Sequence, residues 1–260
     1  MTHPQRRASD DGVRTRQQQI AADLRALILA GDLRPGEKVP STDTLVQRYG
    51  VTNQTVQRAL AILKGEGFLE GRKGSGVFVT GRQPIVVRAN HYPAAAPAGQ
   101  PYPWISDFAS RGRQPTIELL SVGEQKAPSQ VAAAFGVDTE TLVVVRHQLL
   151  LLDGEPAELV WSYYPADIAR GTRLAERRKI PGGSPKILAE LGYPLADAVD
   201  QIGTRLATVE EFIALKLPED MPVLRQLRVV FTKEQQPVEV TVMVKAGQQY
   251  EIQYQLHQPN

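Results

Sequence analysis

The stretch VPSTDTLVQRYGVTNQTVQRALAILKGEGFLEGRKGSGVFV, from Val39 to Val79, decides the fold of the N-terminal part of the chain. Its apolar spacing predicts a short helix over 41–48, a turn at Gly50 and a second helix over 53–64. A basic, glycine-rich hairpin follows, with short strands at 68–70 and 77–79. Helix, turn, recognition helix and wing, in this order, are typical of proteins that read duplex DNA.

The predicted second helix has one apolar and one polar face. Val56, Leu60 and Leu63 form the apolar stripe, so the amides and the arginine opposite them are exposed. Such amides can bond adenine edges, and arginine can bond guanine or a phosphate. Glycines let the hairpin tip approach the DNA backbone, and its two cations suit phosphates or the minor groove. The predicted DNA contacts, helix caps included, are Ser41, Thr52, Asn53, Gln54, Thr55, Gln57, Arg58, Arg72, Lys73, Gly74, Ser75 and Gly76.

The alternative interpretation is an ordinary three-helix domain with a solvated basic hairpin. The charge distribution favours DNA: residues 1–82 hold 13 Lys and Arg against 8 Asp and Glu, whereas the whole chain has a net charge of only +2. This asymmetry fits a basic DNA-binding domain joined to an acidic second half.

Length and composition set the class of protein. With 260 residues and 42% hydrophobic content, the chain is long enough for one or two domains with full cores. Residues 1–16 are polar and lack an apolar signal core, and no apolar run approaches the roughly 20 residues that span a bilayer. We therefore expect a cytoplasmic protein with no membrane association. Cysteine is absent, which rules out disulfides and thiolate metal sites.

A proline- and alanine-rich stretch over 93–103 divides the chain. Such a sequence favours a semi-extended tether over a helix or a central strand. The predicted organisation is a disordered tail over 1–16, a winged helix-turn-helix domain over 17–82, a linker over 83–105 and a second domain over 106–260.

The second half alternates strand and helix patterns and predicts an α+β domain around a mainly antiparallel sheet. Asp153-Gly154 is a hairpin turn signal between two apolar runs. Predicted strands are 141–152, 157–164, 198–206, 222–232, 237–246 and 250–256, and predicted helices are 128–135, 184–191 and 209–215.

Two sets of residues in this chain match a known family. The set in the first half is Pro40, Ser41, Leu45, Val51, Thr55, Val56, Ala59 and Leu60. The set in the second half is Arg111-Gly112, Pro128, Val131-Ala132, 153–156, 162–165, Arg205, Glu210-Glu211, Leu215 and 237–239. On these residues, 17–79 resemble the winged-helix domain of the GntR transcription regulators, and most of 106–257 resembles the UTRA domain of the HutC subgroup. Asp43, Asn53 and Gln57 stand where that family commonly has arginine, which implies an unusual operator.

This resemblance implies a chorismate-lyase-like fold for the second domain and a dimeric repressor whose operator binding a small molecule controls. It also implies the ligand-binding residues Arg146, Ser162, Tyr164 and Glu239, types that suit an anionic or sugar-like effector. Gln148 and Leu150 replace arginines that many relatives carry there. The structural alternatives are that Arg146 pairs with an acid, that Tyr164 packs, and that Glu239 lies on a solvated strand face. Arg205 is expected to pair with Glu210 or Glu211.

The sequence contains no motif of an enzyme. Its four histidines are scattered without metal-ligand spacing, and neither a G-x-S-x-G elbow nor a P-loop is present. No catalytic residue, metal or cofactor is therefore predicted. Two other functions remain open. One is a DNA-tethered lyase-like enzyme with Glu239 as its acid or base, and the other is a DNA-binding protein that needs no ligand.

Overall fold

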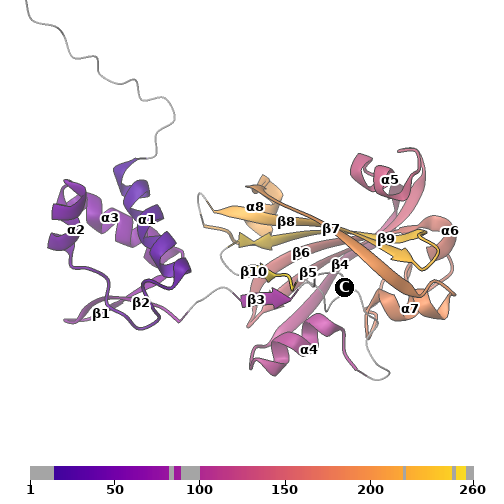
Figure 1. Ribbon diagram of the computed structural model, residues 1–260, viewed down its shortest axis with the longest axis horizontal. Helices are drawn as coiled ribbons and strands as arrows, with labels where there is room; N and C mark the ends of the chain where they lie inside the picture. The colour runs from indigo at the N-terminus through magenta and orange to yellow at the C-terminus, as the bar shows by residue number, and fades with distance from the viewer. Residues whose placement is uncertain (1–14, 82–84, 89–99, 219–220, 248–249, 256–260) are drawn as a thin grey trace, which may run out of the picture. The chain divides into compact units, whose positions relative to one another are not determined.

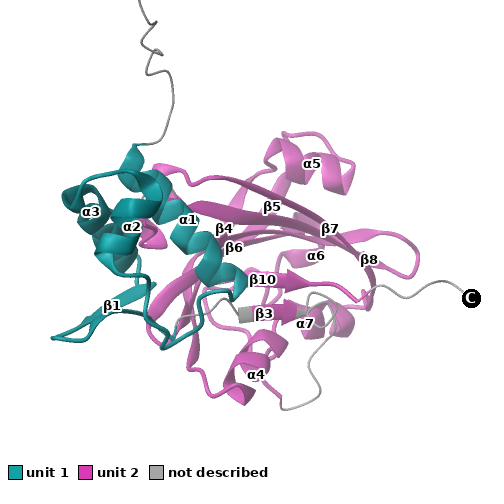
Figure 2. Ribbon diagram, turned by 60° about the vertical axis from the view of Figure 1, so that its left-hand side comes forward, with its two compact units in different colours: residues 1–84 teal, residues 85–260 magenta. Residues whose placement is uncertain are grey.

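The computed structural model describes residues 15–81, 85–88, 100–218, 221–247 and 250–255. The chain forms two compact units, residues 1–84 (unit 1) and residues 85–260 (unit 2), coloured separately in Figure 2. Among the described residues, no helix combines the length and apolarity needed to cross a membrane. The predicted tail over 1–16 lies almost entirely outside the described residues.

Unit 1 contains three helices whose ends follow from their caps: α1 (Arg16–Ala30), α2 (Thr42–Tyr49) and α3 (Asn53–Gly65). The Ser41 hydroxyl accepts the amide of Thr44, and the Thr52 hydroxyl accepts the amide of Thr55, as expected for N-caps. Gly50 ends α2 with a φ of 61°, which a residue with a side chain rarely adopts.

The core of unit 1 joins the predicted apolar stripes to the wing. Its buried side chains come from all three helices and from the hairpin: Ile20, Leu24, Ile28, Leu45, Val56, Leu60, Leu63, Phe68, Leu69 and Val79. The wing itself is an antiparallel pair, β1 (Leu69–Arg72) and β2 (Gly76–Val79). An isolated bridge from Lys38 to Phe78 adds a third segment beside β2.

Unit 2 is built on a six-stranded antiparallel sheet in the order β4-β5-β6-β9-β8-β7. Its β5–β6 hairpin turns at Asp153 and Gly154, both with positive φ, as the sequence predicts. A separate parallel pair joins β3 (Ile85–Arg88) to β10 (Tyr250–Gln253). The sheet strands are β4 (Pro115–Lys126), β5 (Leu142–Leu152), β6 (Glu155–Pro165), β7 (Leu195–Leu206), β8 (Pro222–Thr232) and β9 (Pro237–Ala246).

Helices cover both faces of this sheet, and Figures 1 and 2 show α5 on one side and α4 and α7 on the other. On the first side, α5 (Ser129–Phe135) packs on Val143, Val145 and Val240, and the residues after α8 (Val209–Ala214) pack on neighbouring strands. On the second side lie α4 (Pro103–Ser110), α6 (Ala166–Ala169), α7 (Ser184–Glu190) and the β3–β10 pair.

The structure differs from the expected organisation between the two domains. The segment predicted as a linker, 83–105, contains β3 and the start of α4, and the proline-rich residues up to 99 lie outside the described part. In β3, a β-branched run finds its partner at β10, far along the chain, which local patterns do not reveal. For the same reason, β10 joins β3 and is not the next strand of the main sheet.

Candidate functional site

The exposed face of α3 carries the predicted base-reading side chains. Asn53, Gln54, Gln57 and Arg58 are all exposed, while Val56, Ala59, Leu60 and Leu63 are buried beneath them. The Gln57 amide nitrogen donates to the Thr42 hydroxyl on α2 at 3.1 Å. This bond holds the side chain in place and leaves the amide oxygen and one N–H for another partner.

At the wing tip, residues 72–76 are exposed, and the two cations differ in their surroundings. The Arg72 guanidinium lies over the Phe78 ring at 4.3 Å and pairs with Glu70. Lys73 forms none of the ion pairs found among the described residues. Gly76 has a φ of 118°, which favours glycine, and a Cβ there would also displace the end of the Lys38 side chain.

In unit 2 the strand register places polar residues in one row across the sheet. Arg146 on β5 lies directly opposite Ser162 on β6, which in turn pairs with Thr241 on β9. The row continues through Arg228 on β8 to Asp200 on β7. A second cross-strand pair, Glu158 with Lys245, lies farther along the same face.

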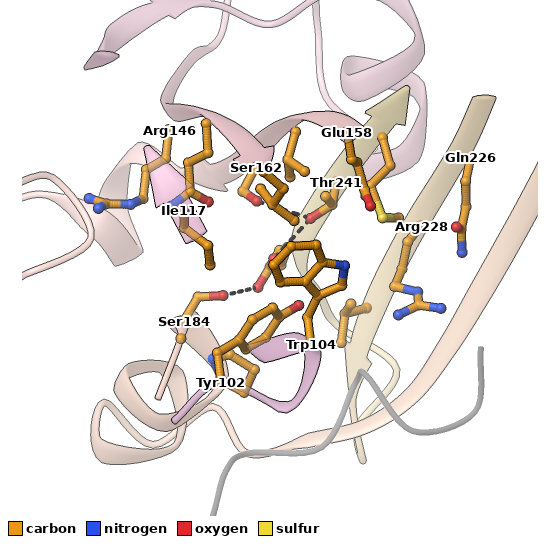
Figure 3. Close-up of a pocket in the computed structure, with 18 of the residues that line it drawn as sticks. Tyr102, Trp104, Ile117, Arg146, Glu158, Ser162, Ser184, Gln226, Arg228 and Thr241 are labelled. Carbon is orange, nitrogen blue, oxygen red and sulfur yellow. Dashed lines mark hydrogen bonds between the residues drawn. The ribbon is translucent and has the colours of Figure 1, made fainter. Parts of the chain in front are cut away.

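These rows form the floor of a cavity of about 130 Å³. Its other walls come from α4, the β3–β10 pair and the segment that leads into α7, as Figure 3 shows for part of the lining. All four ligand-binding residues predicted from the sequence line it: Arg146, Ser162, Tyr164 and Glu239.

Arg146 lines the cavity, and its guanidinium is bonded to a loop beside it. Its guanidinium donates to the backbone carbonyls of Arg173, Leu174, Glu176 and Arg178, at 2.6–3.4 Å. In Figure 3 the guanidinium points away from Tyr102 and Trp104. Burial lowers the pKa of Arg146, and the carbonyl dipoles stabilise its charge. The geometry therefore makes Arg146 an anchor of the loop over 173–178, and its contact with an anionic ligand stays a prediction.

Glu239 lies at the centre of a hydroxyl cluster. Its carboxylate accepts hydrogen bonds from Ser184 at 2.8 Å and from Thr241 at 2.9 Å. The Thr241 and Ser162 hydroxyls are 3.3 Å apart. Burial raises the pKa of Glu239, and the hydrogen bonds offset this only in part. The neighbouring Tyr164 is fully buried, and burial followed by the charge of Glu239 raises its pKa.

Several cavity residues escaped the sequence analysis. Tyr102 and Trp104 follow a proline-rich stretch that predicts a tether, so the sequence does not indicate a cavity wall there. In the structure Pro103 begins α4, because proline is favourable in the first turn of a helix. For Ser184 the sequence predicts only a position in a helix. Arg228 and Glu158 gave no local signal, because only the strand register brings them to the cavity. In contrast, the predicted pairing of Arg205 is confirmed: it binds Glu211 through two bonds of 2.6 Å.

Comparison with known proteins assigns both units. A family model described as bacterial regulatory proteins, gntR family, matches residues 16–79, and the UTRA domain model matches residues 110–251. An uncharacterized HTH-type transcriptional regulator of Rhizobium meliloti is 30% identical over 224 residues, which cover 85% of this chain and 86% of that protein. The HTH-type transcriptional repressor NagR of Bacillus subtilis is 25% identical over 89% of this chain and 90% of its own length.

A solved structure agrees in fold. The crystal structure of PhnF from Mycobacterium smegmatis superposes with a TM-score of 0.57 at 21% identity, covering 92% of this chain and 99% of that one. Both the sequence matches and the order of the two units point to one conclusion. The chain belongs to the GntR family of bacterial transcription regulators, in the HutC-type arrangement of a helix-turn-helix DNA-binding domain followed by a UTRA effector-binding domain.

Proposed function

We propose that this regulator is a homodimeric repressor that reads its operator with α3 and the wing, and that a small molecule in the unit 2 cavity controls this binding. The observation that carries the proposal is the joint presence of an exposed polar recognition face and a buried, polar cavity in separate units. Gly74, Ser75 and Gly76 at the wing tip, together with Ser41, Thr52 and Thr55 at the helix starts, are proposed to contact the DNA backbone.

Base reading is tested at Gln57. We expect Gln57→Ala to cost about 1–3 kcal/mol at one or two base pairs and to relax the preference there, because an amide can make two bonds to one adenine. Operator selection from random duplexes, followed by comparison of the two sequence logos, measures this. Thr42→Val is the matched control, since it removes the partner of Gln57 and leaves the amide in place. An unchanged logo for Gln57→Ala would show that this face does not read bases.

Phosphate contact is tested at Lys73. We expect Lys73→Ala to weaken binding to all sequences similarly and to reduce the slope of log K against log salt by about one. Arg72→Ala is less direct, because it also removes the contact with Phe78. A slope that stays at the wild-type value would exclude Lys73 from the phosphate contacts.

Control by the ligand is proposed to run through β3. Val87 of β3 lines the cavity, as do Tyr250 and Ile252 of its partner strand β10. The Arg111 guanidinium also binds the carbonyl of Val86 at 2.6 Å. Because β3 begins at Ile85, where unit 1 ends, a ligand that shifts the β3–β10 pair acts on the chain that leads to the DNA-binding unit. The ligand changes the free energy of operator binding by the difference between its own binding free energies for the two conformations of the protein.

Dimerisation is proposed through the free edge of the sheet. The edge strand β7 and the helix α8 expose a run of apolar side chains, with Leu206, Val209 and Ile213 each more than two-thirds exposed. Val199, Ile202 and Phe212 on the same two elements are also exposed. A two-fold partner placed here would cover it and set two recognition helices on half-sites roughly 34 Å apart.

We expect the full chain to be a dimer by light scattering at tens of micromolar. The double variant Leu206→Glu/Ile213→Glu should be a monomer, because two buried charges would oppose the interface. Leu142→Glu, another exposed apolar position in unit 2, is the control and should leave the dimer intact. A wild-type monomer would contradict the two-half-site arrangement.

The family assignment supports binding without turnover, because the matched relatives are named transcription regulators. Glu239, the candidate acid or base, is the one buried carboxylate with a raised pKa among the described residues, and hydroxyl groups surround it. We propose binding without turnover, in the cytoplasm, where an operator is accessible. Recovery of an unmodified ligand after incubation with the full chain tests this point.

A further inference from the structure

The cations that line the cavity already have partners within the protein. Arg228 holds Asp200 through two bonds of 2.7 Å, and Lys245 binds Glu158 at 2.5 Å. Arg146 donates to the four loop carbonyls described above. The anionic ligand expected from the sequence would have to displace one of these partners, at the cost of leaving a buried charge uncompensated.

Glu239 is the exception among the charged groups of the cavity. No lysine or arginine among the described residues forms an ion pair with its carboxylate, although the charge of Arg228 acts to lower its pKa. Its bonded partners are neutral hydroxyls, those of Ser184, Thr241 and Tyr164. The residue is only 8% exposed. A carboxylate buried among neutral donors is costly, and a cation brought by a ligand would reduce that cost.

Two further polar atoms of cavity residues have no hydrogen-bond partner among the described residues. They are Oε2 of Glu158, an acceptor, and Nε1 of Trp104, a donor. Buried polar atoms of this kind are almost always satisfied, by water if not by protein or ligand. Tyr102 and Trp104, labelled in Figure 3, add two aromatic rings to the same wall, and aromatic faces attract cations.

Cavity size limits the ligand. The volume of about 130 Å³ is slightly below the ~150 Å³ of an engineered cavity that holds benzene. The cavity therefore matches a ligand built on no more than one small ring.

We infer that the effector of this regulator is a small organic amine whose ammonium group pairs with Glu239, while its body lies against Tyr102 and Trp104. This inference rests on the proposed function, because it names the ligand class of the same cavity. It names a cationic effector where the resemblance implies an anionic or sugar-like one.

Three aromatic probes of similar size test the charge requirement: benzylamine, benzyl alcohol and benzoate, titrated into the full chain by calorimetry. We expect benzylamine to bind at least about tenfold more tightly than benzyl alcohol, and benzoate to bind most weakly, because the unpaired group is an anion. Equal or tighter binding of the alcohol or of benzoate would overturn the amine inference, and so would the absence of any benzylamine binding.

Variants of Glu239 test whether this carboxylate causes the preference for benzylamine. Glu239→Gln should remove the preference for benzylamine and leave benzyl alcohol binding unchanged, whereas Glu239→Asp should keep part of the preference. Glu210→Gln, an exposed carboxylate in the same unit, is the control. Folding is checked by thermal unfolding. An amine preference that survives in Glu239→Gln would overturn the assignment.

Failure of this inference can be distinguished from failure of the proposed function. Binding of the alcohol or of benzoate, if it alters operator affinity, leaves the cavity as the effector site and rejects only the amine. If benzylamine binding depends on Glu239 but does not change operator affinity, the inference of an amine ligand stands. The proposal that a ligand controls DNA binding is then rejected.

Discussion

Replacing Arg146 with alanine is expected to lower the free energy of unfolding of unit 2 by about 3–5 kcal/mol. The guanidinium satisfies four carbonyls of the 173–178 loop, and bonds to a charged group are worth more than neutral ones. Without it, that loop would lose its anchor and the cavity one of its walls. We therefore expect the ligand response to be lost, while operator affinity at 25 °C is retained.

The two tryptophans, Trp104 and Trp161, both lie in unit 2, so urea unfolding followed by tryptophan fluorescence measures this unit alone. Arg178→Ala is the matched control: its exposed side chain is removed, but its carbonyl still accepts from Arg146. Wild-type stability in Arg146→Ala, combined with a selective loss of anion binding, would restore the role expected from the sequence.

The second large effect is expected in unit 1, where Glu66→Ala should cost about 3–5 kcal/mol. Glu66 caps the end of α3 and binds Arg25 on α1 through two bonds of 2.5 and 2.8 Å. Its side chain is 3% exposed, so the truncation leaves a largely buried arginine without its partner. A unit of this size has little stability to spare, and we expect α3 to lose its fixed position and operator binding to fail at 37 °C.

Far-UV circular dichroism should show the loss of helix, while the tryptophan signal of unit 2 stays unchanged. The double variant Arg25→Met/Glu66→Leu is the control, because replacing both partners by apolar groups of similar size is close to neutral. Full operator binding by Glu66→Ala at 37 °C would mean that this ion pair does not hold the recognition helix.

Local signals explain why unit 1 is largely predictable from the sequence. Ser41 and Thr52 are N-cap residues that mark where α2 and α3 begin, and Gly50 adopts the left-handed backbone that ends α2. The apolar residues of α3 recur with the period of a helix. Each signal acts within a few residues, so no distant partner is needed to interpret it.

Unit 2 is less predictable because its decisive contacts are distant in sequence. The strand β4 lies at the sheet edge, its side chains alternate only between half-buried and exposed, and its register shifts between Leu119 and Ser121, so its apolar pattern is weak. Arg146 and Ser162 could be placed together, since a hairpin turn fixes their register. The carbonyls that bind Arg146 come from an irregular loop without a sequence pattern, so these partners cannot be predicted from the sequence.

The most direct test of the account is the operator affinity of the full chain, measured by fluorescence anisotropy with and without an effector found by thermal-shift screening. Salt must be fixed, because it alone changes such affinities by orders of magnitude. We predict a change of at least about fivefold in the full chain, the usual lower range of allosteric coupling, and none in residues 1–84 alone. A ligand that occupies the cavity and leaves the operator affinity of the full chain unchanged would contradict the account.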